Sequence, residues 1–189
     1  MITRAKGNLN FESFKTILNK VEKSIVYLTL YFQGEPFLNP EIFEMISYAR
    51  KRKVFVCTST NGHYLNEEFS RKIIDSGLHK LIISIDGTTQ ESYSKYRKNG
   101  NLETVMSGLD HLLLQKKLLK SSSPFIEIQF IVFKHNEHEI GDIMKLAQLE
   151  GVDSVVLKTA QIVNEEDFDD LLPSNQSYSR YKKTSGGIL

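Results

Sequence analysis

Apolar residues are distributed along this chain in two alternating patterns. Short runs rich in β-branched and aromatic residues predict strands, whereas segments with an apolar residue at every third or fourth position predict helices with one buried side. The runs predict five strands, at residues 25–32, 54–59, 80–85, 125–133 and 154–158. The spaced pattern predicts helices over residues 10–21, 40–53, 66–76, 88–96, 102–117 and 137–149.

Residues that favour helix starts stand where several of these helices would begin. Asn10 or Ser13 is expected to cap the first helix, and Asn66 the third, because their side-chain oxygens can accept the free N–H groups of a first turn. Pro40 follows Asn39 and suits the first position of the second helix, where its missing N–H costs nothing. These signals support the regular succession of strand and helix.

The predicted strands are apolar on both faces and are separated by helical segments. This combination is typical of a parallel sheet covered by helices, in an α/β fold. A doubly wound sheet and an open β/α barrel both have this rhythm, and periodicity does not choose between them. The segment from Asn164 is acidic and then polar, so we expect residues 1–163 to form the domain and residues 164–189 a weakly ordered linker toward a further domain.

Composition narrows the function classes. The 189 residues carry a net charge of +1, so charge gives no reason to expect nucleic acid or an acidic membrane as a partner. Cys57 is the only cysteine, which excludes an intramolecular disulfide and a cysteine metal cage within one chain. The first residues lack the apolar core of a signal peptide, and no stretch approaches the ~20 apolar residues of a membrane span, so the expected location is the cytoplasm.

Polar residues collect at the carboxyl ends of the predicted strands, where ligands sit in parallel α/β folds. The first strand ends in Gln33-Gly34-Glu35-Pro36. Gly34 allows a close approach to the backbone, and Pro36 holds Glu35 extended. The turn therefore offers carbonyl oxygens and a carboxylate to a ligand ammonium group, although a plain strand-to-helix turn explains the same residues.

Other strand ends add weaker signals. Ser84 and Asp86 are two residues apart and share a strand face, where they could bond a ribose or a carboxylate. Thr60-Asn61-Gly62 ends the second strand, although Asn-Gly is also a turn signal. Arg97 has the planar guanidinium that clamps a carboxylate, but an isolated arginine is usually solvated.

Taken in order, these motifs resemble a known family. A strand ending Gly-Glu-Pro, a strand ending Thr-Asn-Gly, and Ser-Ile-Asp-Gly followed by Tyr93, Tyr96-Arg97 and Gly100 resemble the core domain of radical S-adenosylmethionine enzymes. The segments GNLNFESFKTIL, QFIVFKHNEHEI and LLPSNQSYSRY are similar to the SPASM-type branch, whose members carry a cysteine-rich carboxy-terminal extension. The resemblance implies a partial (β/α)6 barrel that cleaves S-adenosylmethionine reductively at a [4Fe–4S] cluster and abstracts hydrogen from a peptide or small-molecule substrate.

The resemblance also assigns cofactor contacts to residues at the strand ends, namely Gly34, Glu35, Pro36, Thr60, Asn61, Ser84, Asp86, Arg97 and Asn136. The Gly-Glu-Pro turn would face the amino group of the cofactor, the serine would bond the cofactor, and the arginine would hold its carboxylate. The Thr-Asn pair and the aspartate would line the barrel mouth, and Asn136 would lie near the adenosine side.

The sequence departs from the family pattern at the cluster. The family's first strand ends in a Cys-x3-Cys-x2-Cys loop, and Cys57 alone cannot replace three thiolates. We therefore expect a fragment of a longer enzyme that lacks the first strand and the cysteine-rich extension. It would have no catalytic or metal-ligating residue of its own and would be inactive alone. The missing strand would expose a sheet edge beside residues 26–32, through which the chain would associate.

Two alternatives stay open. A non-catalytic barrel without a cluster could bind a nucleotide or peptide, or act with a separately encoded cluster-bearing piece or a reductant protein. A phosphate-binding β/α enzyme is weaker, because no glycine-rich phosphate loop is present.

Overall fold

The five predicted strands form one parallel sheet in a computed structural model that describes residues 7–162, 167–181, 183–184 and 187–188. The strands are β1 (Tyr27–Thr29), β2 (Phe55–Thr60), β3 (Lys80–Ser84), β4 (Phe125–Val132) and β5 (Ser154–Thr159). Their order in the sheet is their order in the sequence. In a doubly wound sheet the order of the strands reverses at a switch point. The consecutive order seen here therefore identifies the open-barrel alternative. Two short strands, β6 (Lys183–Thr184) and β7 (Gly187–Ile188), form a separate antiparallel pair.

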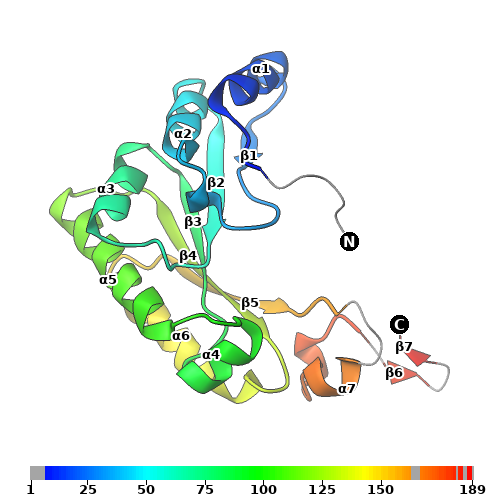
Figure 1. The fold of residues 1–189 in the computed structure, drawn as a ribbon. Coiled ribbons are helices and arrows are strands. Elements are labelled where there is room, and N and C mark those ends of the chain that lie inside the picture. The colour runs from blue at the N-terminus through cyan, green and yellow to red at the C-terminus, as the bar shows by residue number, and fades with distance from the viewer. Residues whose placement is uncertain (1–6, 163–166, 182, 185–186, 189) are drawn as a thin grey trace.

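The main helices cover one face of the sheet (Figure 1). Parallel crossovers are right-handed, and when every crossover steps the same way the helices fall on the same side. The helices are α1 (Phe11–Val21), α2 (Ile42–Lys51), α3 (Glu67–Asp75), α4 (Gln90–Tyr96), α5 (Leu102–Leu118), α6 (Ile140–Lys145) and α7 (Phe168–Leu171). Short 3₁₀ turns are η1 (Pro36–Leu38), η2 (Glu137–Glu139), η3 (Leu146–Gln148) and η5 (Gln176–Tyr178). None of the described helices is long and apolar enough to cross a membrane.

Two predicted caps are confirmed, and one helix start is corrected. Asn10 Oδ1 accepts from the Ser13 N–H at 2.8 Å, and Asn66 Oδ1 accepts from the Phe69 N–H at 2.9 Å. The second helix begins at Ile42 rather than at Pro40, because Asn39 first forms a tight turn. Its side-chain oxygen accepts from the backbone of residue 41 at 3.0 Å, and its carbonyl accepts from that of residue 42 at 3.2 Å.

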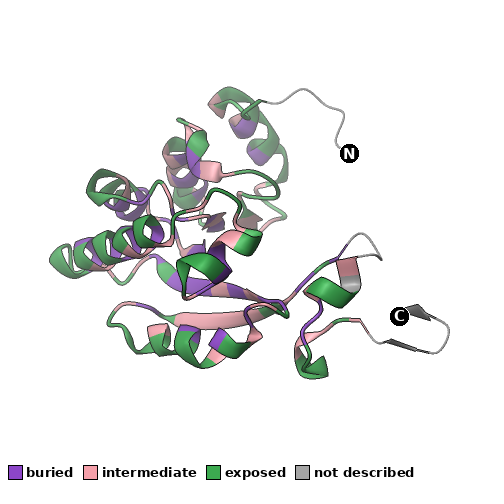
Figure 2. Cartoon of the chain, turned by 60° about the horizontal axis from the view of Figure 1, so that its bottom comes forward, coloured by how far each residue is buried: buried purple, intermediate pink, exposed green. Residues whose placement is uncertain are grey.

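The hydrophobic core lies between the sheet and these helices (Figure 2). Successive strand residues point to opposite faces, so alternate positions build the core. Its fully buried apolar strand residues are Val56, Leu81, Ile83, Ile126, Ile128, Phe130 and Val132. The intervening positions face the barrel interior and are more polar: Lys80 of β3 and Glu127 of β4 form an ion pair there at 2.7 Å.

Two predicted elements are shorter than expected. Within residues 25–32, only Tyr27–Thr29 forms a strand, because the chain turns away at Gly34, whose φ is +81°. The helix predicted over residues 137–149 is divided into η2, α6 and η3. Buried Glu139 is bonded to the start of α4, which fixes the backbone there, and Gly141 weakens the helix beyond it.

Part of the predicted linker is folded. Leu172, just after α7, is buried with Phe133 and Ile162, which follow β4 and β5. The Tyr181 hydroxyl accepts from the Ile162 N–H at 3.0 Å and donates to the Ile162 carbonyl at 3.2 Å. Residues 167–181 therefore pack on the barrel, where the sequence predicts a weakly ordered linker. The domain boundary at residue 163 stays a prediction, and residues 163–166 lie outside the described part.

Candidate functional site

A pocket of about 130 Å³ opens where β1, β2 and β3 end. Its lining brings together these residues predicted from the sequence: Gly34, Glu35, Thr60, Asn61, Ser84 and Arg97. They come from three strand ends and from the end of α4, which are far apart in the sequence. The carboxyl ends of neighbouring parallel strands meet at one edge of a sheet, and this geometry explains why the residues converge.

Glu35 ties the ends of β1 and β2 together. Its Oε1 accepts from the Thr60 hydroxyl at 2.9 Å and from the Phe37 N–H at 3.1 Å, and its Oε2 accepts from the Asn61 N–H at 2.7 Å. Hydrogen bonds to an ionised acceptor are among the stronger ones in proteins. The carboxylate thus shapes the pocket wall by linking two strand ends.

Arg97 enters the pocket from the end of α4. Its Nε donates to Asp86 Oδ2 at 2.6 Å, and Asp86 Oδ1 accepts from the Ile131 N–H at 2.7 Å. Burial raises the pKa of Asp86, while the Arg97 guanidinium and the Ile131 N–H favour its charged form. The sequence predicts Asp86 at the barrel mouth, but the structure places it fully buried behind Arg97.

Asn136 is also buried behind the pocket. Its Nδ2 donates to the carbonyls of Asp86 at 3.0 Å and Ile131 at 2.9 Å, and its Oδ1 accepts from the Phe133 N–H at 2.7 Å. The side chain therefore joins the ends of β3 and β4. Pro36 begins η1 and lines a neighbouring hollow of about 380 Å³. Asp86, Asn136 and Pro36 are the predicted residues that the structure does not bring into the pocket lining.

Tyr31, Phe32 and Ser59 line the pocket but are missing from the sequence-based set. Ser59 could have been found, because it shares a strand face with Cys57 and opposes Ile82 in the register. Glu139 was missed as well, although it organises the start of α4. No local signal marks it, because the groups that it bonds are about 50 residues away in the sequence.

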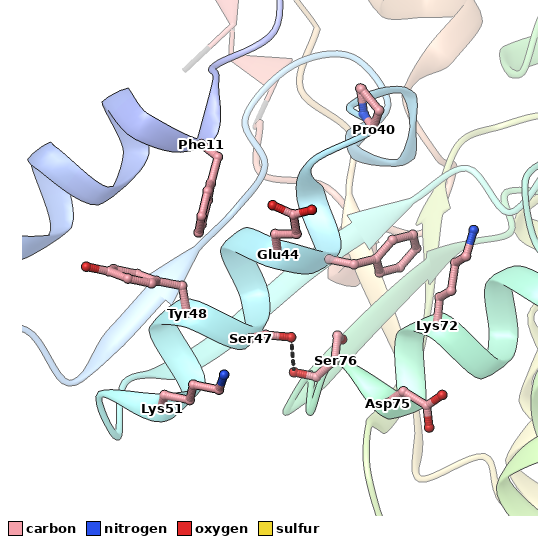
Figure 3. A pocket seen from close by; sticks show the side chains of 10 residues that line it. Phe11, Pro40, Glu44, Ser47, Tyr48, Lys51, Lys72, Asp75 and Ser76 are labelled. Atoms are coloured by element: carbon pink, nitrogen blue, oxygen red, sulfur yellow. Dashed lines mark hydrogen bonds between the residues drawn. The ribbon is translucent and has the colours of Figure 1, made fainter.

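A larger hollow of about 560 Å³ lies among α1, α2 and α3 (Figure 3). Its side chains include Glu44, Lys51, Lys72 and Asp75, so charges of both signs surround it. The polar contact drawn inside it joins the Ser47 hydroxyl to the Ser76 carbonyl at 3.3 Å. The hollow lacks polar groups converging from several strand ends, and we assign the functional site to the smaller pocket.

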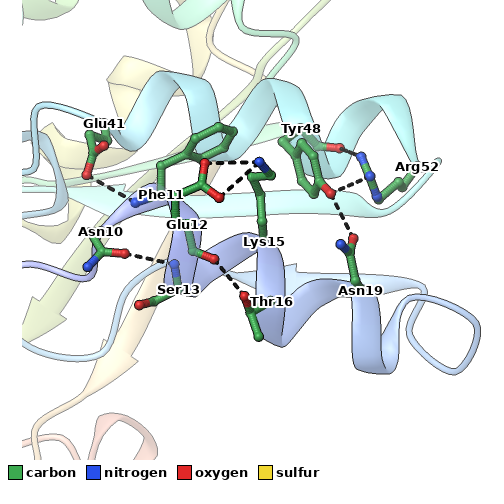
Figure 4. A network of polar contacts seen from close by, with 10 residues as sticks. All are labelled: Asn10, Phe11, Glu12, Ser13, Lys15, Thr16, Asn19, Glu41, Tyr48 and Arg52. Carbon is green, nitrogen blue, oxygen red and sulfur yellow. Dashed lines mark hydrogen bonds and ion pairs between the residues drawn. The ribbon is translucent and has the colours of Figure 1, made fainter.

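A polar network fastens α1 to α2 beside this hollow (Figure 4). Glu41 accepts from the Phe11 N–H at 3.1 Å, and the Tyr48 hydroxyl donates to Asn19 at 2.8 Å. Arg52 bonds the same hydroxyl, and its guanidinium lies 3.4 Å from the centre of the Tyr48 ring. These contacts hold α1 and α2 together. The polar residues beside the hollow therefore have a structural role, and no ligand is needed to explain them.

Residues 2–147 match the family profile described as the Radical SAM superfamily. The chain therefore belongs to the radical SAM superfamily. It is 29% identical over 143 residues to the AdoMet-dependent heme synthase of Methanosarcina barkeri, covering 75% of this chain and 39% of that protein. It is 27% identical over 150 residues to the mycofactocin maturase MftC of Mycobacterium ulcerans, covering 78% and 38%. The chain thus spans less than two fifths of the length of these relatives.

Solved structures agree with the fold. Streptococcus suis SuiB bound to S-adenosylmethionine superposes with a TM-score of 0.70 at 11% identity, over 92% of this chain and 39% of that one. Archaeal TYW1 superposes with a TM-score of 0.59 at 19% identity, over 96% and 67%. The predicted partial barrel is therefore confirmed.

Membership of the superfamily implies two cofactors, S-adenosylmethionine and a [4Fe–4S] cluster, and they fit this chain differently. The pocket offers a partly exposed guanidinium and polar strand ends, which suit the charged amino-acid end of S-adenosylmethionine. A cluster needs several thiolates, but Cys57 is the only cysteine and is buried in β2. No group of three His, Cys, Asp or Glu side chains suited to a metal occurs among the described residues. The described residues of this chain therefore do not form a cluster site.

Proposed function

We propose that this chain is the S-adenosylmethionine-binding part of a radical enzyme of the SPASM-type branch, which acts in the cytoplasm on a peptide or a small molecule. The observation that carries the proposal is the convergence of three strand ends and Arg97 on one pocket, within a fold of this superfamily. One relative is named a mycofactocin maturase and another a heme synthase, and these names support the two substrate classes of the proposal.

The pocket would hold the polar end of the ligand. Its volume of about 130 Å³ is below the ~300–1,000 Å³ of sites that enclose a whole small molecule. Arg97 would bind the carboxylate, and the backbone of the turn at Gly34 and Glu35 would accept from the ammonium group. Ser84 would bond the cofactor, while Thr60 and Asn61 would border the part that extends along the mouth. Bound S-adenosylmethionine supplies the carbon radical of this superfamily's chemistry.

A non-catalytic binding module is the second candidate, and the single cysteine favours it. Such a module would bind the ligand without cleaving it, or would act with a cluster-bearing piece or a reductant protein. The two candidates share the binding step. They differ in whether cleavage of S-adenosylmethionine is restored when another protein supplies the three thiolates.

Equilibrium dialysis of the chain with radiolabelled S-adenosylmethionine tests the shared step. We expect saturable binding of one ligand per chain. Arg97→Gln should weaken it by about tenfold or more, because it removes charged hydrogen bonds. Arg71→Gln is the matched control, since that guanidinium is exposed on α3 and pairs with Asp75 at 3.7 Å. Absence of saturable binding, or equal effects of both substitutions, would overturn the proposed site.

Anaerobic reconstitution with iron and sulfide tests the statement about the cluster. We expect no stoichiometric iron on the chain after desalting, because one buried thiol cannot hold a four-iron cluster. About four irons per chain, with a reduced-cluster signal in electron paramagnetic resonance, would contradict this expectation.

A further inference from the structure

Asp86 and Arg97 form an ion pair that is buried on one side and open on the other. The Asp86 side chain is 0% exposed, whereas that of Arg97 is 26% exposed and lines the pocket. Asp86 binds the Nε atom of the guanidinium. The two Nη groups lie at the far end of the same planar fork, and a carboxylate can be held there by two parallel hydrogen bonds.

Asp86 is itself fixed from β4 and the turn that follows it. The Ile131 N–H donates to its Oδ1 at 2.7 Å, and Asn136 Nδ2 donates to its backbone carbonyl at 3.0 Å. The carboxylate therefore has one position relative to the ends of β3 and β4. A guanidinium bonded to it must adopt one orientation, which removes rotamer freedom that a ligand would otherwise have to restrict.

The backbone that carries Arg97 is held from the same direction. Glu139 is 3% exposed, and its Oε2 accepts from the Thr88 N–H at 2.8 Å and from the Ser92 hydroxyl at 2.7 Å. These bonds anchor the first turn of α4, at whose other end the Arg97 N–H donates to the Tyr93 carbonyl at 2.9 Å. Thus the segment from β4 to η2 fixes both the helix and the carboxylate that orients the arginine.

We infer that Asp86 is a positioning residue that orients Arg97 toward the carboxylate of an α-amino-acid ligand, and this inference rests on the proposed function. It makes the pocket selective for the carboxylate end of S-adenosylmethionine. A ligand without that carboxylate would gain nothing from the orientation.

The test compares two ligands, S-adenosylmethionine and its decarboxylated analogue, by equilibrium dialysis on the wild-type chain and on Asp86→Asn. We expect the substitution to weaken binding of S-adenosylmethionine by about tenfold and that of the analogue by less than about twofold. Asp75→Asn on α3 is the matched control, because it breaks an exposed aspartate–arginine pair and should change neither affinity. Equal weakening for both ligands, or none for either, would overturn the inference.

Two further measurements distinguish a failure of the proposed function from a failure of the positioning role of Asp86. Arg97→Lys retains a cation beside Asp86 but lacks the fork, so it should lose the preference for the carboxylated ligand even if Asp86→Asn does not fold. The Arg97 Nε–H resonance in ¹⁵N-correlated spectra needs no ligand. We expect it to be protected from exchange in the wild-type chain and lost in Asp86→Asn. A protected Nε–H without ligand binding would refute the proposed function alone, whereas an unprotected one would refute the positioning role.

Discussion

At the scale of single residues, Glu35 shows how a predicted ligand residue serves the protein itself. The sequence predicts that this carboxylate faces a ligand ammonium group. In the structure the carboxylate accepts hydrogen bonds from Thr60, Asn61 and Phe37. A side chain that joins two strand ends keeps the mouth in one shape before any ligand arrives.

Glu35→Gln should destabilise the fold. The amide keeps one acceptor oxygen but directs an NH₂ group toward N–H donors, and an unsatisfied part-buried donor costs about 1–3 kcal/mol. We expect the free energy of unfolding in urea to fall by about that amount. Glu44→Gln, at an exposed position of α2, should change it by less than about 0.5 kcal/mol. Equal stability of the Glu35 variant and the wild type would contradict the linking role.

The sequence was a good guide to which residues share the pocket. It was a poorer guide to the role of each residue there. Gly34, Thr60, Ser84 and Arg97 converge because the ends of parallel strands meet whatever the loop details are. The burial of Asn136 depends instead on contacts between segments about 50 residues apart, such as its bond to the Asp86 carbonyl. No periodic pattern or short motif records contacts of that kind.

At the scale of elements, the loop between β3 and α4 is closely packed against the start of α4. A Cβ atom built on Gly87 would lie 2.4 Å from the Tyr93 nitrogen and 2.6 Å from Ser92 Oγ. The first turn of α4 therefore packs directly against the glycine backbone. This close approach places the helix so that Arg97, the residue just after its end, reaches the pocket.

Gly87→Ala should push α4 away and destabilise the chain by about 1–3 kcal/mol, as overpacking does. The matched control is Gly141→Ala in α6, where a Cβ atom would meet nothing within 4 Å. Alanine favours helices over glycine, so this change should be neutral or slightly stabilising. Thermal unfolding followed by circular dichroism would separate the two variants. If both melted at the wild-type temperature, the packing explanation would be wrong.

Element types were predictable from periodicity, whereas several boundaries depended on tertiary contacts. Five strands occur where apolar runs predicted them, and Asn10 and Asn66 cap their helices as expected. The helix predicted over residues 137–149 is interrupted because Glu139 is recruited by the start of α4. A local pattern carries no information about that distant partner.

At the scale of the whole molecule, the sheet has an open side at β1. In the described part of the chain β1 pairs only with β2, and Val26 and Phe32 beside it are 81% and 88% exposed. Unpaired strand edges with exposed apolar residues promote association between chains. The open barrel thus leaves the β1 edge of the sheet ready to pair with another strand.

Val26→Lys should reduce concentration-dependent association of the isolated chain, because a charge on an edge strand opposes pairing. Light scattering over a range of concentrations would measure the effect as a lower average mass. Leu118→Lys is the control, since that leucine is 64% exposed at the end of α5, away from the edge. A chain that stays monomeric at every concentration, or equal effects of the two substitutions, would count against an edge-mediated contact.

The consecutive strand order also has a consequence for synthesis of the chain. Each strand of the sheet pairs with the strand made just before it, so the barrel can grow by one strand and one helix at a time as the polypeptide leaves the ribosome. The residues that complete the pocket are synthesised after the strands that line it. Arg97 is in place once α4 has formed, but the groups that fix Asp86 and α4 come from Ile131, Asn136 and Glu139. A nascent chain therefore acquires the three strands that line the pocket before it acquires the groups that fix Asp86 and α4, and β5 is made after both.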